Sequence, residues 1–289
     1  MIPHSSRPAL LRQQSSIFYM TKNIPLILAA ICLGALHSGF AQSAPESIDL
    51  SKFPAAEVDN VVVPVPSEVF SVLDKLGTPN WRAELRSSLG KNSGNRAQVA
   101  LLLGTVIAEG FIAVEAEDSE RVKDIGKEVL VLAEAINVRK AVIARSKSIT
   151  EKAEAKNWRS VRTEFDGALQ DVRAAMEELG DDELAQLVSI GGWLRGTQVL
   201  TSIVSKNYSA DGAELLYQPQ LLDYFTKRLD GLKNTRLGKD ELVVKIRKTL
   251  AGIRPLIGKD DGAKIPAENV DRINKMTSEV IAAITSKEA

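Results

Sequence analysis

One long stretch without a polar face constrains the fold more than any other part of the sequence. Residues 97–116 read AQVALLLGTVIAEGFIAVEA, and between Val99 and Val114 the only charged residue is Glu109. A helix that is apolar on all sides is buried either in a large protein core or in a membrane. Most other segments have the spacing of amphipathic helices, so we expect them to cover this stretch in a globular core.

A second apolar helix is predicted from Glu183 to Lys206, where Arg195 is the only charge between Leu184 and Ser205. Its Gly-x-x-x-Gly spacing resembles a membrane dimer face, but its interior polar residues favour tight packing in a globular core instead. We therefore predict that the two apolar helices pack side by side. The glycines expected at their contact are Gly104, Gly110, Gly192 and Gly196.

The two apolar helices each carry one central charge, and the two charges have opposite signs. An ionised group buried without a partner costs several kcal/mol, so each charge needs one. We predict that Glu109 and Arg195 meet or share a polar network. In the competing arrangement, Arg195 reaches solvent along its stem while Glu109 faces a pocket.

The remaining pattern predicts an all-α fold: a multi-helix bundle or irregular helical array of about eight to ten helices behind an extended Pro-rich leader. Between Gly126 and Gly167 there is neither Pro nor Gly, which favours one long helix from Ser119 to Lys156 over a break near Asn137. Its expected apolar seam includes Ile143. The other expected helices span 67–76, 81–89, 96–117, 158–179, 221–232 and 240–257, with a last one after Pro266.

The N-terminal region has the order of a secretory signal. Lys22 precedes the apolar run from Ile24 to Leu36, and small residues Gly39 and Ala41 follow at the positions that a signal peptidase reads. The run is shorter than the about 20 residues that a membrane-spanning helix needs. We expect residues 1–41 to be a signal peptide with an upstream extension, translation to begin at Met20 rather than Met1, and the product to be periplasmic or secreted without a membrane span.

The expected mature chain begins with a Pro- and Val-rich leader at residues 42–66, followed by a single all-α domain at residues 67–289. Prolines at 45, 54, 64 and 66 exclude a helix in the leader. The valines before Pro64 favour extended backbone because residues that precede proline avoid the α region. We expect the leader to dock on the helical body as a short strand-like piece; a free tether is the alternative.

Cleavage after Ala41 would remove every histidine and cysteine of the chain, namely His4, His37 and Cys32. The mature chain would then lack Ser-His-Asp and Cys-His catalysis, zinc sites of thiolate or imidazole, and disulfides. We expect no cofactor and no metal. It would keep 34 Lys and Arg against 37 Asp and Glu, a net charge of −3, which argues against sequence-independent nucleic-acid binding.

Few residues remain that could form a functional site. Glu109 is the carboxyl group that we most expect to be buried. Burial would raise its pKa and could make it a general acid, although no second carboxylate at a useful distance can be identified. An aromatic group beside the irregular segment 207–220 could line a groove for a ligand or partner. The binding candidates are Glu109, Arg195, Trp193, Tyr208, Tyr217 and Tyr224, with Phe225 beside them.

Three functions are compatible with these features. The first is a non-enzymatic scaffold or binding protein that acts through helix faces on a protein partner of unknown identity. The second is a carboxylate-based hydrolase or lyase that acts on envelope polymers through Glu109. The third is a binder of an apolar small molecule between the two apolar helices. A closed core with Glu109 paired would favour the first function, and an acidic cleft around Glu109 would favour the second.

We predict that the exported protein begins at Gln42 or within a few residues of it, because the Gly39-Phe40-Ala41 sequence suits signal peptidase. The intact mass of protein recovered from the exported fraction would measure this. A mass that still includes residues 24–36 would instead indicate a membrane anchor.

Overall fold

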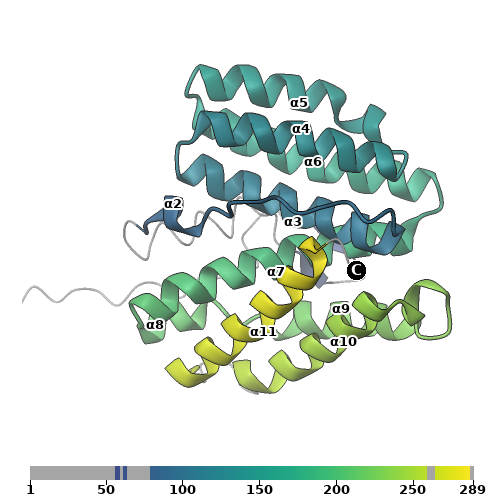
Figure 1. Cartoon of the computed structure of the whole chain (residues 1–289). Helices are drawn as coiled ribbons and strands as arrows, with labels where there is room; N and C mark the ends of the chain where they lie inside the picture. The colour runs from purple at the N-terminus through teal and green to yellow at the C-terminus, as the bar shows by residue number, and fades with distance from the viewer. Residues whose placement is uncertain (1–55, 59–60, 64–78, 259–263, 287–289) are drawn as a thin grey trace, which may run out of the picture. The chain divides into compact units, whose positions relative to one another are not determined.

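Residues 56–58, 61–63, 79–258 and 264–286 are described by the computed structural model of the chain. They belong to the unit Asp49–Ala289. The all-α class is confirmed, and the described part is a multi-helix array (Figure 1). The predicted helix 67–76 and most of the leader lie outside the described residues. The helices are α2 (Trp81–Glu84), α3 (Arg96–Glu115), α4 (Ser119–Ala135), α5 (Arg139–Glu154), α6 (Trp158–Glu178), α7 (Asp182–Lys206), α8 (Ala210–Glu214), α9 (Pro219–Gly231), α10 (Glu241–Ile253) and α11 (Ala267–Thr285).

The described leader residues form a hairpin of two short antiparallel strands. The strands β1 (Ala56–Val58) and β2 (Val61–Val63) pair with Ala56 opposite Val63. The extended backbone predicted for the valines before Pro64 is thus confirmed at β2. Because β2 contacts α9, this part of the leader docks on the helical body as predicted.

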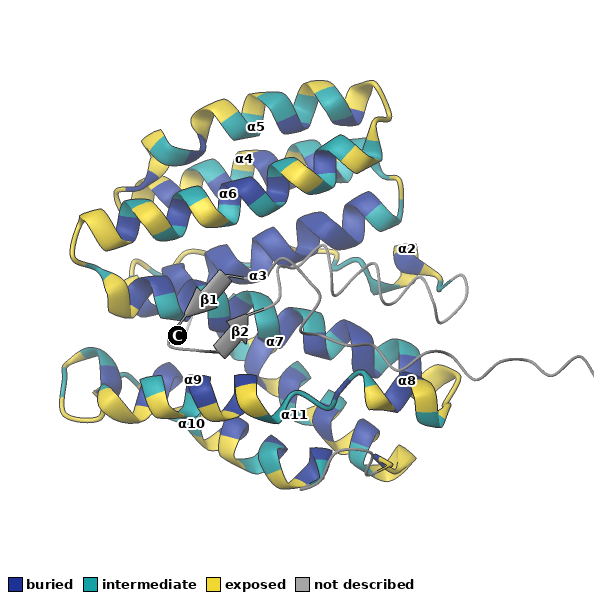
Figure 2. Cartoon of the chain, turned by 180° about the vertical axis from the view of Figure 1, so that it is seen from behind, coloured by how far each residue is buried: buried dark blue, intermediate teal, exposed yellow. Residues whose placement is uncertain are grey.

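The two apolar helices lie side by side in the centre of the array. Helices α4, α5 and α6 lie on one side of the α3–α7 pair, and α9, α10 and α11 lie on the other (Figure 1). Figure 2 shows α3 buried along nearly its whole length, whereas most residues of α5 are exposed or intermediate. Among the described residues, α3 alone is long and apolar enough to span a membrane, and its most apolar 18 residues are entirely buried.

The contact between α3 and α7 is close enough to exclude side chains. A Cβ atom added at Gly104 would lie 1.9 Å from the carbonyl oxygen of Val188, and one added at Gly191 would lie 2.1 Å from that of Leu101. The predicted side-by-side packing is confirmed, but the predicted set of glycines is partly wrong. Gly110 makes room for Phe165 of α6 instead, whereas Gly192 does lie at the contact, because its backbone nitrogen would be 2.9 Å from a Cβ added at Gly104. At Gly196, an added Cβ would meet none of the described atoms within 4 Å.

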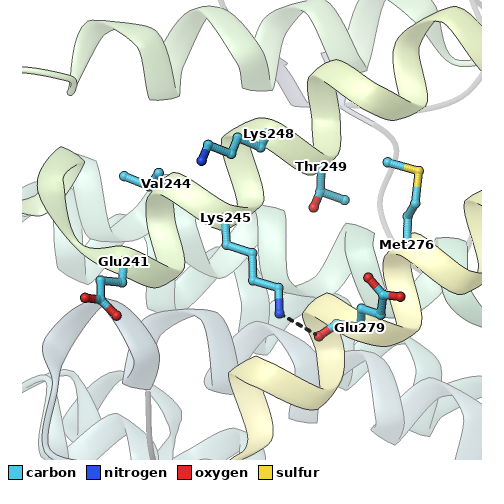
Figure 3. A pocket seen from close by; sticks show the side chains of 7 residues that line it. All are labelled: Glu241, Val244, Lys245, Lys248, Thr249, Met276 and Glu279. Carbon is cyan, nitrogen blue, oxygen red and sulfur yellow. Dashed lines mark hydrogen bonds between the residues drawn. The ribbon is translucent and has the colours of Figure 1, made fainter.

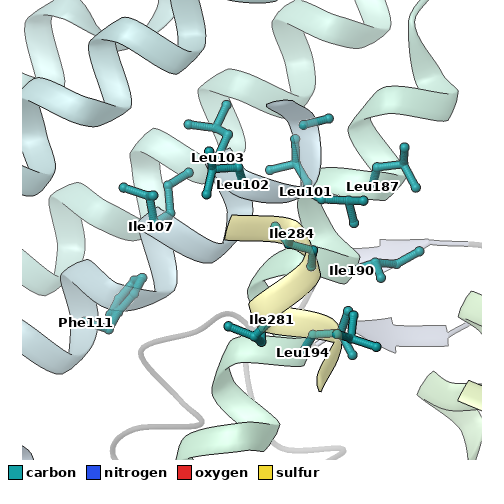
Figure 4. Close-up of a cluster of buried hydrophobic side chains, with 14 of the residues drawn as sticks. Leu101, Leu102, Leu103, Ile107, Phe111, Leu187, Ile190, Leu194, Ile281 and Ile284 are labelled. Carbon is teal, nitrogen blue, oxygen red and sulfur yellow. The ribbon is translucent and has the colours of Figure 1, made fainter. Parts of the chain in front are cut away.

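Leucine and isoleucine side chains fill the space around this contact. Figure 4 shows them converging from α3, α7 and α11. Each of these side chains is at most 2% exposed, so three helices distant in sequence share one apolar core. The labelled members are Leu101, Leu102, Leu103, Ile107, Phe111, Leu187, Ile190, Leu194, Ile281 and Ile284.

The favoured single helix from Ser119 to Lys156 is wrong, because the chain reverses at Asn137. This residue has φ 66°, and the Val138 N–H reaches back to the Ala133 carbonyl oxygen at 2.8 Å, which closes a Schellman motif. Asparagine tolerates the left-handed region better than most residues, so no glycine marks the break. The break also shifts the phase of the apolar face: Val142 is buried, while the predicted seam residue Ile143 is 48% exposed.

The same reversal recurs at every junction from α3 to α7. One residue with positive φ ends each helix, and the residue after it is the N-cap of the next helix. Such short connections bring consecutive helices together as antiparallel hairpins. The four positive-φ residues are Glu117, Asn137, Lys156 and Gly180, and the N-caps that follow are Asp118, Val138, Asn157 and Asp181.

The predicted helix 81–89 is also wrong beyond Glu84. Asn80 caps α2 as its sequence suggests, because its side chain accepts the Ala83 N–H. Leu85, however, has ψ 134°, and the chain continues without helix up to Asn95. The physical reason is that the Glu84 carbonyl and the Arg86 N–H form hydrogen bonds with the buried side chains of Arg195 and Glu109.

We predict opposite effects for the same substitution at two glycines of α7. Gly191→Ala should destabilise the protein by about 3 kcal/mol or more, because its methyl group would collide with the backbone of α3. Gly196→Ala should stabilise it by about 0.5–1 kcal/mol, because alanine favours the helix and the methyl group has room. Urea unfolding measures both; equal effects would contradict the close α3–α7 contact.

Candidate functional site

The predicted pairing of Glu109 with Arg195 is confirmed. Arg195 Nε donates to Glu109 Oε2 at 2.8 Å, and the two side chains are 3% and 1% exposed. They come from the middle of α7 and α3, where the close approach of the two helices brings the charges together. The competing arrangement, with Arg195 in solvent and Glu109 facing a pocket, is therefore wrong.

Backbone groups of the segment after α2 complete this ion pair. The Arg86 N–H donates to Glu109 Oε1 at 2.6 Å, and Arg195 Nη2 donates to the Glu84 carbonyl oxygen at 2.5 Å. Both carboxylate oxygens of Glu109 are thus occupied. Because the carbonyl of Glu84 and the N–H of Arg86 point at this pair, the chain leaves the helical path after Glu84.

The polar network continues from α7 to α11. Arg195 Nη1 donates to Gln198 Oε1 at 2.9 Å, and Gln198 Nε2 donates to Ser278 Oγ at 3.1 Å. Asn274 Nδ2 donates to the Gln198 carbonyl oxygen at 3.0 Å. Every step is a hydrogen bond between fixed groups, so the network holds helices in register rather than presenting a reactive group.

A second charge cluster joins α5 to α6. The Glu164 carboxylate accepts hydrogen bonds from Lys152, from Arg145 Nη1 at 3.1 Å and from Ser148 Oγ at 3.0 Å. The hydrogen bond from Lys152 is the main cause that lowers the pKa of Glu164. Arg145 Nε also binds Asp171 Oδ2 at 2.8 Å. Sequence spacing within one helix does not reveal this cluster, because its members lie on two helices.

The predicted aromatic candidates do not form one groove. Trp193 Nε1 donates to Gln218 Oε1 at 2.9 Å, and its ring lies 5.9 Å from that of Phe225. Tyr224 is 6% exposed, and its hydroxyl donates to Gln186 Oε1 at 3.1 Å. Tyr217 is partly buried against the same core.

Tyr208 lies apart from this group. It is 44% exposed, and its hydroxyl donates to the Ile265 carbonyl oxygen at 2.9 Å. That hydrogen bond ties the end of α7 to the chain just before α11. The arrangement favours core-edge packing for the aromatic residues over a shared binding surface, and their predicted binding role remains a prediction.

An open groove of about 420 Å³ lies between α10 and α11 (Figure 3). Lys245 Nζ spans it and donates to the Glu279 carbonyl oxygen at 3.4 Å. None of the six predicted site residues lines the groove. Its lining mixes acidic, basic and apolar side chains: Glu241, Val244, Lys245, Lys248, Thr249, Met276 and Glu279.

Three large apolar side chains that the sequence analysis did not assign to a surface are exposed. Val131 of α4, Ile143 of α5 and Leu179 after α6 are 54%, 48% and 55% exposed. Antiparallel hairpins place the end of α4, the start of α5 and the end of α6 at the same end of this layer. We call these three residues the apolar trio. Leu179 is the C-cap of α6 and lies beyond the packed turns of that helix.

The described part of the chain contains no group of three or more His, Cys, Asp or Glu residues that could hold a metal ion. No family model matches the chain, and neither a curated protein nor a solved structure matches it.

We predict strong coupling between Glu109 and Arg195. Glu109→Gln and Arg195→Met should each destabilise the protein by about 3–5 kcal/mol, because each strands a buried charge. The double variant should lose clearly less than the sum of the two. Urea unfolding of the four proteins measures the coupling.

The exposed pair Lys147–Glu151 of α5 serves as the control. Its atoms lie 3.8 Å apart on side chains that are 81% and 65% exposed, so its coupling should be at most about 0.5 kcal/mol. Additive losses at Glu109 and Arg195 would show that the buried pair is not energetically coupled.

Proposed function

We propose that the chain is an exported, non-enzymatic helical scaffold or binding protein that acts through its helix faces on a protein partner. One observation carries this proposal: Glu109, the candidate general acid, is 1% exposed and binds Arg195 and the Arg86 N–H through both oxygens. A general acid must reach the substrate, within hydrogen-bond distance or through one water. Glu109 is instead committed to joining α3, α7 and the segment after α2.

The structure gives less support to the other two functions. A hydrolase that uses Glu109 would need an acidic cleft at this residue, whereas the pair lies in the closed core. A binder of apolar molecules between α3 and α7 would need space there. Close backbone contacts at Gly104 and Gly191 fill that position, so no specific observation favours this function.

The apolar trio supports an interaction through helix faces. Exposed apolar side chains scattered singly are ordinary, but three that lie toward the same end of one layer could contribute to a common interface. The three come from consecutive helices joined by connections of three residues, 136–138 and 155–157, and we infer that their relative positions are set before any partner binds. Such preorganisation favours binding because less conformational entropy is lost.

Export is part of the same proposal, and the signal-like order of residues 22–41 supports it. A mature chain without cysteine and histidine must obtain its stability from packing alone. The continuous core from α2 to α11 agrees with that requirement.

We predict that Ile143→Glu and Leu179→Glu weaken partner binding at least tenfold without lowering the melting temperature, because both residues are exposed. Complexes of the mature protein would be isolated from its own cells, identified by mass spectrometry and remeasured with purified partner. Ala144→Glu adds the same charge at the next exposed position of α5 and should leave the affinity unchanged. Equal affinities for all variants would rule out the apolar trio as the interface.

A further inference from the structure

The ion pair at the centre of the fold is surrounded by an excess of positive charge. Arg86 lies near the Glu109–Arg195 pair, and both Arg195 and Arg121 interact electrostatically with Arg86. Arg121 Nη2 also donates to the Arg86 carbonyl oxygen. Around Arg86, the guanidinium groups of Arg121 and Arg195 are thus opposed by one carboxylate, that of Glu109. The next carboxylates along the seam are already paired: Asp118 binds Arg82, and Glu84 binds Lys206.

The guanidinium group of Arg86 has no acceptor among the described residues. Its backbone N–H binds Glu109, but its buried Nη1 lacks a hydrogen-bond partner, and so does the buried Nε of Arg121. Burial lowers the pKa of Arg86, as do Arg195 and Arg121, while Glu109 raises it. The protein thus holds a cation in a place that disfavours its charge, and no described residue accepts a hydrogen bond from its buried Nη1.

A buried donor atom without an acceptor is costly, which makes an anion the expected complement. The planar fork of arginine suits an oxyanion with two oxygens, such as a carboxylate, phosphate or sulfate group. Both Arg86 and Arg121 remain partly exposed, so solvent reaches their side chains.

We propose that Arg86 and Arg121 bind a small free oxyanion where the segment after α2 meets the first turn of α4. The ligand class is a phosphate, sulfate or carboxylate group. Arg195 remains committed to Glu109 and contributes only its field. The bound anion neutralises the excess charge around the central ion pair and braces α2 against α4.

The test is thermal unfolding of the mature protein, residues 42–289, in inorganic phosphate, sulfate or acetate, each against sodium chloride of the same ionic strength. Phosphate should raise the melting temperature saturably, by roughly 5 °C at about a hundred times its Kd, because only the folded state binds it. A rise with sulfate as well identifies a general tetrahedral-anion site, and a rise with acetate alone identifies a carboxylate site. Equal rises in chloride would overturn the proposal, because they reflect screening.

Two substitutions locate the site. Arg86→Met should abolish the anion-dependent rise and should not lower the melting temperature in chloride, because it removes an uncompensated charge. Arg82→Gln is the control: Arg82 is 64% exposed and pairs with Asp118, so its loss should leave the anion response intact. An undiminished response in Arg86→Met would overturn the proposal.

A measurement on the unmodified protein covers the case in which Arg86→Met fails to fold. The ¹⁵N-labelled arginine side chains give separate Nε–Hε resonances that can be followed during a phosphate titration. The Arg86 and Arg121 resonances should shift saturably with one common Kd, while the Arg82 resonance stays in place. Shifts confined to exposed arginines would contradict a site at Arg86.

Discussion

The contact between α3 and α7 is the interaction on which the other helices depend. Glycines allow the two backbones to meet, and that approach sets the distance at which Glu109 reaches Arg195. The pair forms hydrogen bonds with the backbone of the segment after α2. Through Gln198 it is also linked by hydrogen bonds to the side chain of Ser278 on α11. An ion pair so deeply buried need not add net stability, but a wrong arrangement of these four elements would strand a charge.

The sequence was most informative where exposing apolar surface or burying an unpaired charge would cost so much free energy that few arrangements remain. Two helices without a polar face had to form the centre, and a single charge within each had to find the other. These inferences required neither a partner of known structure nor a family. The choice among glycines was harder, because several lie at helix–helix spacing and only the crossing geometry decides that Gly191, rather than Gly196, meets the opposite backbone.

The features that the sequence did not reveal have two origins. Some depend on backbone conformations that differ little in free energy, and others depend on contacts with residues distant in sequence. Asn137 can continue a helix or reverse it, and packing of α4 against α5 selects the reversal. That one-residue difference exposes Ile143 and buries Val142. Similarly, Leu85 to Leu89 have adequate helix propensity, but the hydrogen bonds that Glu84 and Arg86 make to the central pair outweigh it. The exposure of Ile143 and the uncompensated Arg86 depend on these same departures from the simple pattern.

The separation of 86 residues between Glu109 and Arg195 has a consequence for how such a chain is made. Helices α3 to α6 can assemble as they emerge, because each short reversal joins neighbours in sequence. The far side of α3, however, stays uncovered until α7 has been completed. If the chain crosses a membrane N-terminus first, the apolar surface of α3 is exposed to solvent before α7 has emerged to cover it. A holding chaperone on the receiving side would then matter more for biogenesis than for the finished fold.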